Sequence, residues 1–284
     1  MNSPLKWPGG KHYVARQLVE LMPRHTHYME PYAGSLAVLL AKPCDGISEI
    51  VNDLHGDLTT FWRVLQSPSL FRRFRRRIEA VPFSETEWKN AKEVLTKPPE
   101  TNPRSTTQVD RAVRFFILCR QSLAGRCKNF APISRRRTRR NMNEQAAAWL
   151  RAIEGLPEVH ARLQRVVILN RPAVKVIRSQ DEPGTLFYLD PPYHPDTRAS
   201  VGQSGACEMT AAEHEELLDV VLCLQGKVLL SGYACPLYDS RLAGWQRREF
   251  DLPNHQASGV LKRRMTEVLW CNFKPASHDN KEVA

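Results

Sequence analysis

Strand-like and helix-like segments alternate at both ends of this chain of 284 residues, and this alternation constrains its fold more than any other feature. Apolar, β-branched and aromatic runs predict strands at residues 27–32, 47–51, 165–169, 185–189 and 227–230. Apolar residues at helical spacing predict helices at 11–21, 36–41, 57–79 and 211–224. Strands that alternate with helices form a mostly parallel sheet with helices on both faces. We therefore predict an α/β fold.

The middle of the chain, residues 80–160, is helix- and loop-like and interrupts this alternation. It contains a stretch at 96–107 that is rich in Pro, Thr and Ser, which is typical of a linker. We predict that 80–160 is a mainly helical insertion into a sheet domain formed by 1–79 and 161–275. Strands at 245–252 and 267–273 should form an antiparallel pair, and 276–284 a flexible tail.

Two helix starts carry the sequence pattern of a capping box. Ser84 with Glu87, and Thr210 with Glu213, place a hydroxyl three residues before a carboxylate. Such pairs satisfy the first backbone N–H groups of a helix from both directions. The pattern supports helices that begin near 85 and 211.

Charge and composition favour a protein that binds a polyanion and argue against a membrane protein, a secreted protein or a zinc protein. The chain has 41 Lys and Arg against 30 Asp and Glu, a net charge of +11, which favours a polyanionic partner. The longest apolar run, at 36–41, is too short to span a bilayer, and the N-terminus carries no apolar signal segment. The seven cysteines are scattered, without the spacing of a zinc site. We expect a cytoplasmic protein with no membrane span and no metal, either a monomer or a weak dimer.

The tetrapeptide Asp190-Pro191-Pro192-Tyr193 directly follows an apolar predicted strand, where parallel sheets carry functional groups. Consecutive prolines remove two N–H donors, so a carboxylate and a proline carbonyl stand side by side as acceptors. Together they could accept both hydrogens of an amino group, and Tyr193 offers a flat face for stacking. A strand-ending turn with a surface tyrosine is the alternative interpretation.

Two further segments lie at predicted strand ends. Glu30 to Ser35, EPYAGS, runs through a glycine turn into a helix that Ser35 could cap, or it is an ordinary connection. It lacks a GxGxxG pattern, which argues against a pyrophosphate cradle. Asn52-Asp53 ends the next strand, where Asp53 could bind ribose hydroxyls or cap the following helix. The two segments favour a nucleoside ligand without phosphates.

The segment Leu5 to Lys11 reads LKWPGGK. A Pro-Gly-Gly turn allows a ligand to approach the backbone closely, with Trp7 and Lys11 on either side. The alternative is an N-terminal tail with a chance aromatic residue.

In order and spacing, these four segments resemble the Dam-type DNA adenine methyltransferases. That family carries a KWxGGK-like segment, an EPFxGxG-like segment, an acidic strand end, an inserted recognition region and DPPY. The corresponding segments here are KWPGGK, EPYAGSLAV, VNDLHGD and DPPY, with weaker echoes at 231–233 and 264–270. The resemblance spans residues 5–273.

One position departs from the family pattern. Leu36 stands where the family has its second motif glycine. Leucine does not take a positive φ cheaply, so we expect the turn to differ locally and cofactor affinity to be affected.

The resemblance implies a seven-stranded Rossmann-like sheet and methyl transfer from S-adenosylmethionine to the 6-amino group of adenine in double-stranded DNA, as in restriction–modification systems. It assigns catalysis to Asp190, Pro191, Pro192 and Tyr193. It assigns cofactor binding to Trp7, Lys11, Glu30, Gly34, Asp53 and Asp190, with Asp53 on the ribose hydroxyls. Transfer is expected to be a direct in-line displacement on a base flipped out of the duplex.

Arginines of the insertion are the expected DNA contacts, because a basic loop suits phosphates or a groove. They are Arg120, Arg126, Arg135, Arg136, Arg137, Arg139 and Arg140. A solvated charge run is the alternative. The arginines at 72–77 surround apolar residues at helical spacing, which is more typical of the outer face of a core-packing helix.

Three other functions stay open. A methyltransferase for the amino group of cytosine or glutamine would use the same geometry. A catalytically inert DNA-binding protein on a degenerate methyltransferase fold would still be basic. A nicotinamide oxidoreductase would need the glycine fingerprint that the sequence lacks.

Overall fold

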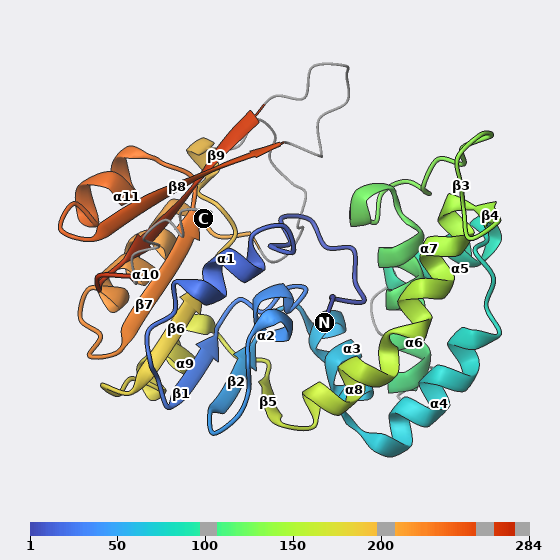
Figure 1. Ribbon diagram of the computed structural model, residues 1–284, viewed down its shortest axis with the longest axis horizontal. Helices are drawn as coiled ribbons and strands as arrows, with labels where there is room; N and C mark the ends of the chain where they lie inside the picture. The colour runs from blue at the N-terminus through green and yellow to red at the C-terminus, as the bar shows by residue number, and fades with distance from the viewer. Residues whose placement is uncertain (97–106, 198–207, 254–263, 276–284) are drawn as a thin grey trace, which may run out of the picture. The chain divides into compact units, whose positions relative to one another are not determined.

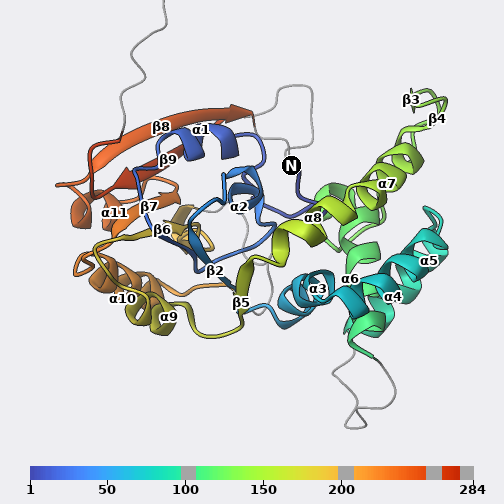
Figure 2. The same cartoon turned by 60° about the horizontal axis from the view of Figure 1, so that its bottom comes forward.

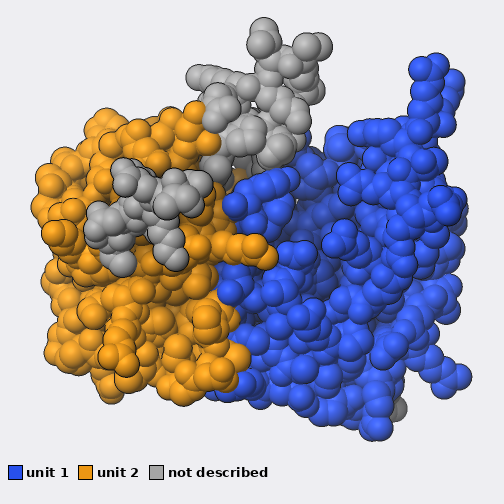
Figure 3. All heavy atoms as spheres, in the orientation of Figure 1, with its two compact units in different colours: residues 1–13, 34–41, 55–170 blue, residues 14–33, 42–54, 171–284 orange. Residues whose placement is uncertain are grey.

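The computed structural model describes residues 1–96, 107–197, 208–253 and 264–275. The predicted linker, apart from its two end residues, and the predicted tail lie outside these ranges. The chain forms two compact units, each built from several segments (Figure 3). Unit 1 comprises residues 1–13, 34–41 and 55–170, and unit 2 comprises 14–33, 42–54 and 171–284.

A seven-stranded sheet has the order β5-β2-β1-β6-β7-β9-β8 (Figure 1). The strands are β1 (His27–Glu30), β2 (Ser48–Asn52), β5 (Val166–Leu169), β6 (Thr185–Leu189), β7 (Lys227–Gly232), β8 (Gln246–Pro253) and β9 (Arg264–Cys271). β1 pairs in parallel with β2 and β6, and β6 pairs in parallel with β7. β9 is antiparallel to both β7 and β8. The predicted α/β fold, a mostly parallel sheet with an antiparallel C-terminal pair, is confirmed.

The helices of unit 2 lie on both faces of the sheet. They are α1 (Ala15–Glu20), α9 (Ala173–Ser179), α10 (Ala211–Val221) and α11 (Pro236–Arg241), with a 3-10 turn at Pro195–Thr197. Figure 2 shows α9 and α10 together on one face and α1 on the other. All five residues of β6 are therefore buried, which explains its continuous apolar sequence. The predicted capping box of Thr210 and Glu213 opens α10.

Unit 1 is mainly helical. Its helices are α2 (Ala37–Ala41), α3 (Gly56–Gln66), α4 (Pro68–Glu79), α5 (Glu85–Thr96), α6 (Gln108–Gln121), α7 (Glu144–Glu154) and α8 (Leu156–Leu163), with a 3-10 turn at Leu123–Gly125. A small hairpin joins β3 (Thr138–Arg139) to β4 (Met142–Asn143). The central helix α6 is buried along much of its length, and its Phe116 stacks on Phe61 of α3 at 5.6 Å between ring centroids.

The predicted helix at 57–79 is wrong, because two helices occupy this stretch. Pro68 begins α4, and Ser67 before it is extended, with ψ 122°. Proline disfavours a helical conformation in the preceding residue, so α3 ends at Gln66. The first predicted helix is also too long, since α1 starts only at Ala15.

No helix in the described part of the chain is both long and apolar enough to cross a membrane.

Candidate active site

The carboxyl ends of three neighbouring strands of unit 2, β2, β1 and β6, bring together three of the four sequence motifs. β1 and β6 pair from His27 with Thr185 to Met29 with Phe187, and β6 and β7 pair up to Leu189 with Leu230. Parallel strands end at the same edge, so the residues after β1, β2 and β6 share this edge of the sheet. Glu30, Asp53 and Asp190 belong to these three strand ends.

Asp190 is held in place by a side chain from the neighbouring strand. The pairing of Leu189 with Leu230 puts Ser231 beside Asp190, and the Ser231 Oγ lies 2.9 Å from Asp190 Oδ1. The buried Tyr188 hydroxyl lies 3.3 Å from the same Oγ. A hydroxyl has one proton to donate and can accept others, so Tyr188 can donate to Ser231 while Ser231 donates to the Asp190 carboxylate.

The two prolines shape the backbone that follows. Pro191 is buried and Pro192 is half-buried. Neither residue has an N–H group, so only carbonyl oxygens of this stretch can hydrogen-bond. The segment therefore combines an oriented carboxylate with a backbone that offers acceptors.

Tyr193 is fixed at its hydroxyl and at its ring. The hydroxyl donates to Glu267 Oε1 at 2.9 Å. The ring meets that of Tyr233 edge-on, with centroids 4.5 Å apart and an interplanar angle of 69°. Burial raises the pKa of the phenol well above its usual value, and the carboxylates of Asp190 and Glu267 raise it further. The phenol thus stays protonated at neutral pH.

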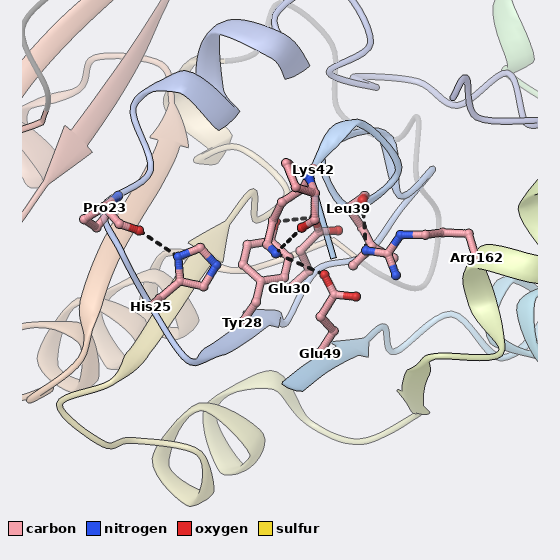
Figure 4. A network of polar contacts seen from close by, with 9 residues as sticks. Pro23, His25, Tyr28, Glu30, Leu39, Lys42, Glu49 and Arg162 are labelled. Atoms are coloured by element: carbon pink, nitrogen blue, oxygen red, sulfur yellow. Dashed lines mark hydrogen bonds and ion pairs between the residues drawn. The ribbon is translucent and has the colours of Figure 1, made fainter. Parts of the chain in front are cut away.

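Glu30 is buried at the end of β1. Its Oε1 accepts the hydroxyl of Tyr28 at 2.5 Å, and burial followed by the charge of Glu30 raises the pKa of that phenol. The Lys42 Nζ pairs with Glu49 at 3.1 Å and lies 4.8 Å from the centre of the Tyr28 ring (Figure 4). Glu30 is thus a carboxylate held in a fixed position within a buried polar network.

Asn52, for which the sequence indicated no role of its own, ties two strand ends together. Its Nδ2 donates to the carbonyls of Pro31 and Arg171, each at 3.0 Å, and its Oδ1 accepts the Arg171 N–H at 2.9 Å. Its carbonyl accepts the N–H of Ala33 at 2.9 Å. Asn52 thereby fixes the turn after β1 and the backbone that leads into the half-buried Asp53.

Asp53 does not cap the following helix. The N-cap of α3 is His55, whose ring accepts the N–H of Leu58 at 3.3 Å. The capping alternative for Asp53 is therefore wrong.

The LKWPGGK segment forms a defined turn in unit 1. Gly10 N–H donates to the Trp7 carbonyl at 3.1 Å, and Gly9 has φ +73°. Proline followed by a positive-φ glycine is typical of a type II turn. The buried Lys11 folds back, and its Nζ donates to the Gly9 carbonyl at 3.1 Å.

Gly34 and Trp7 are packed against each other within unit 1. Gly34 has φ +46°, and a Cβ at this position would lie 3.1 Å from Trp7 Nε1. The Trp62 Nε1 donates to the Gly34 carbonyl at 3.2 Å. Trp7 also lies near the His55 and Phe115 rings, with centroids 5.8 and 6.2 Å away. Only glycine fits this turn without moving the indole.

The expectation that the turn at Leu36 avoids a positive φ is wrong. Leu36 has φ +57° and is completely buried. A left-handed conformation costs a non-glycine residue about 1–2 kcal/mol. Full burial of a leucine side chain contributes about 1.5–3 kcal/mol, so packing offsets the strain. Helix α2 starts at Ala37, so Leu36 directly precedes it in place of the expected Ser35.

Most of the predicted DNA-contacting arginines lie on and around the exposed β3–β4 hairpin. Arg140 and Asn141 form its two-residue turn, with φ +53° and +58°, as type I′ hairpins require. Arg137 pairs with Glu144 at 2.9 Å and Arg140 with Glu154 at 2.8 Å. The remaining three make no ion pair with any residue in the described ranges. These three are Arg135, Arg136 and Arg139.

Arg120 and Arg126 lie elsewhere in unit 1, and both are half-buried. Arg120 Nη2 donates to the carbonyl of Ala148 at 2.8 Å, and burial lowers the pKa of the guanidinium to about 10. This setting differs from that of the hairpin, since the side chain already connects α6 to α7.

Within the described ranges, no three His, Cys, Asp or Glu side chains are grouped so that they could hold a metal ion.

Comparison with known proteins adds to this geometry. Residues 7–248 match the family described as D12 class N6 adenine-specific DNA methyltransferase. A curated relative, the retron Ec67 DNA adenine methylase of Escherichia coli, is 27% identical over 129 residues. The aligned region covers 45% of this chain and 43% of that protein, so the chain spans less than half of the relative's length.

Proposed function

This chain belongs to the D12 class of N6 adenine-specific DNA methyltransferases, and on that basis we propose that it methylates the 6-amino group of adenine in a specific double-stranded DNA sequence. The observation that best supports the proposal is the oriented Asp190 carboxylate beside Pro191, at the carboxyl edge of the parallel strands. The methyl donor proposed is S-adenosylmethionine.

The DPPY residues suit the activation of an aromatic amine. The lone pair of the adenine amino group is delocalised into the ring, which makes the nitrogen a weak nucleophile. Asp190 and the Pro191 carbonyl would each accept one amino hydrogen and draw the nitrogen towards tetrahedral geometry. The lone pair then points at the donor, and positioning with electrostatics supplies the acceleration.

Access to an adenine inside a duplex requires the base to be flipped out, at a cost of a few kcal/mol. Tyr193 would stack on the flipped base and recover part of that free energy. Its ring is already fixed by Tyr233 and Glu267, which supports this role.

The residues of unit 2 fit the proposed cofactor. S-adenosylmethionine supplies, when bound, a methyl group on a positively charged sulfur, which is transferred by direct in-line displacement. Asp53 stands directly after β2, where a carboxylate can bind ribose hydroxyls, and Glu30 is a buried carboxylate at the end of β1. Trp7, Lys11 and Gly34 remain further proposed cofactor residues, because their segments resemble the motifs of the family.

Unit 1 is proposed to contact the DNA. The exposed arginines of the β3–β4 hairpin suit phosphates or a groove, and a net charge of +11 favours a polyanion. Arg120 and Arg126 are kept as proposed contacts.

The test is transfer of tritium from labelled S-adenosylmethionine to DNA, with wild type compared with Asp190→Ala. We expect wild type to transfer the label. Asp190→Ala should transfer it at least about tenfold more slowly, because a loss of transition-state stabilisation above about 1.4 kcal/mol lowers the rate more than tenfold. The affinity of this variant for DNA should be largely unchanged. Sequencing of modified bases in DNA from cells that express the protein identifies the base and its sequence context. Binding without transfer would support the inert DNA-binding alternative, and methylated cytosine would support the other amine.

A further inference from the structure

The carboxyl group of Glu267 is buried beside the DPPY segment. Glu267 belongs to β9, and only 9% of its surface is exposed. Its Oε1 accepts the Tyr193 hydroxyl at 2.9 Å. The contact joins residues 74 positions apart, so the fold alone brings them together.

The register of the antiparallel strands explains why this carboxylate reaches Tyr193. β9 pairs with β7 so that Val268 lies opposite Gly232. The next step along both strands places Glu267 beside Tyr233, whose ring contacts that of Tyr193. The phenol is therefore held from β9 at its oxygen and from the end of β7 at its ring.

Burial of a carboxylate at this position is unfavourable in free energy. Removing an ionised carboxyl group from water is unfavourable unless hydrogen bonds compensate, and apolar residues of similar volume are often equally stable. The bond from Tyr193 compensates part of that cost. What a carboxylate offers and an apolar side chain does not is a directional acceptor for one phenol hydroxyl.

We propose that Glu267 is a positioning residue for methyl transfer, holding the Tyr193 ring in the orientation in which it stacks on the flipped adenine. The inference rests on the function proposed above. Glu267 acts through the Tyr193 hydroxyl, and adenine contacts the ring alone.

A double-mutant cycle tests the proposal. Glu267→Leu removes the acceptor at similar volume, and Tyr193→Phe removes the hydroxyl while keeping the ring. We measure the single-turnover rate of methyl transfer at saturating DNA and S-adenosylmethionine, well below the melting temperature. Each single variant should be about tenfold slower, as expected for the loss of a hydrogen bond to a charged group, and the double variant no slower than either.

Two further variants separate positioning from folding. Glu267→Gln keeps a carbonyl oxygen that can accept the hydroxyl, so its rate should lie within about threefold of wild type. Thr266→Ala changes the exposed neighbour on the same strand and should leave the rate unchanged. A purely structural role would lower the melting temperature of Glu267→Leu and leave the rate of the folded protein intact.

The proposal is overturned if Glu267→Leu transfers at the wild-type rate, or if it slows the Tyr193→Phe variant as much as it slows wild type. If Glu267→Leu does not fold, the rate of Tyr193→Phe tests the proposal instead. A wild-type rate in that variant shows that the hydrogen bond between Tyr193 and Glu267 has no role in transfer. A wild type that methylates no DNA overturns the proposed function itself, which is a separate result.

Discussion

At the scale of single residues, orientation matters as much as identity. Asp190 is the proposed catalytic acceptor, yet its carboxylate is aligned by Ser231, which Tyr188 contacts in turn. Both residues that supply the supporting hydroxyls, Tyr188 and Ser231, are buried. A group held in this way does not need to reorganise when substrate binds, which is the condition for effective positioning.

Ser231→Ala should therefore slow methyl transfer without preventing it. Loss of one hydrogen bond to a carboxylate corresponds to about 1.5–3 kcal/mol, or roughly a 10- to 160-fold lower kcat, with little change in the KM for DNA. Steady-state kinetics measures both constants. Ser240→Ala, on the exposed side of α11, is the control. An unchanged kcat would show that Asp190 keeps its orientation without Ser231.

Leu36 illustrates a second residue-scale balance, between strain and burial. Leu36→Gly relieves the cost of φ +57° but leaves a cavity in place of a fully buried side chain. The cavity lowers the free energy of unfolding by about 2–5 kcal/mol, and the relief of strain raises it by about 1–2 kcal/mol. We expect the free energy of unfolding to fall by about 2 kcal/mol, within a range of about 0–4 kcal/mol, as measured by denaturant titration. A more stable Gly variant would show that the strain exceeds the packing.

At the scale of elements, the sequence predicted those strands and helices whose apolar residues form a clear run or a regular period. The strand at Thr185–Leu189 has the predicted bounds, because a strand buried on both faces reads as a continuous apolar run. The break between α3 and α4 at Pro68 could also have been predicted, because the residue before a proline disfavours a helical conformation. The helical periodicity on both sides of the proline led to the prediction of one continuous helix instead.

Other elements and contacts could not be read from the sequence. Helix α11 has six residues and each hairpin strand has two, too few to show a period. The sequence placed the DPPY segment at a strand end, but the partners Ser231 and Glu267 depend on the pairing of β7 with β6 and β9. The hydrophobic pattern of a strand indicates which side chains face the core, but it does not say which distant strand lies beside it or which residues are opposite one another.

The β3–β4 hairpin carries an element-scale prediction. Replacing Arg135, Arg136 and Arg139 by Gln should weaken DNA binding and flatten its dependence on salt. The slope of log K against log salt concentration should fall by about 0.9 for each phosphate that the variant no longer neutralises. Binding is measured by fluorescence anisotropy at several salt concentrations. The same changes at Arg72, Arg73 and Arg76, exposed on α4, are the comparison. An unchanged slope in the hairpin variant would place the hairpin away from DNA.

At the scale of the whole molecule, one half-buried cation, Lys6, should make stability depend on pH. Burial, and then the nearby Arg120, lower the pKa of Lys6 from 10.5 to about 8, and Glu144 opposes the shift. The unfolded chain therefore binds more protons between these two values, so stability rises as the pH increases from about 8 to 10.5. Below pH 8 the charged lysine destabilises the fold by a constant amount.

Lys6→Met should be more stable than wild type at pH 7, by an amount on the order of 1–3 kcal/mol after allowance for partial exposure. The difference should shrink as the pH is raised from about 8 to 10.5. Denaturant unfolding at pH 7, 8, 9 and 10 measures it. Lys89→Met changes an exposed lysine of α5 and serves as the control. A Lys6→Met variant less stable than wild type at pH 7 would contradict the prediction.

The segmented make-up of unit 1 has a consequence for how the protein is made. Trp7 packs near Phe115, which leaves the ribosome 108 residues later. At a synthesis rate of roughly 5–20 residues per second, the opening segment waits about 5–20 s for that aromatic partner. Unit 1 cannot complete its packing while the chain is short, and a nascent chain stalled before α6 should expose its first tryptophan to chaperones.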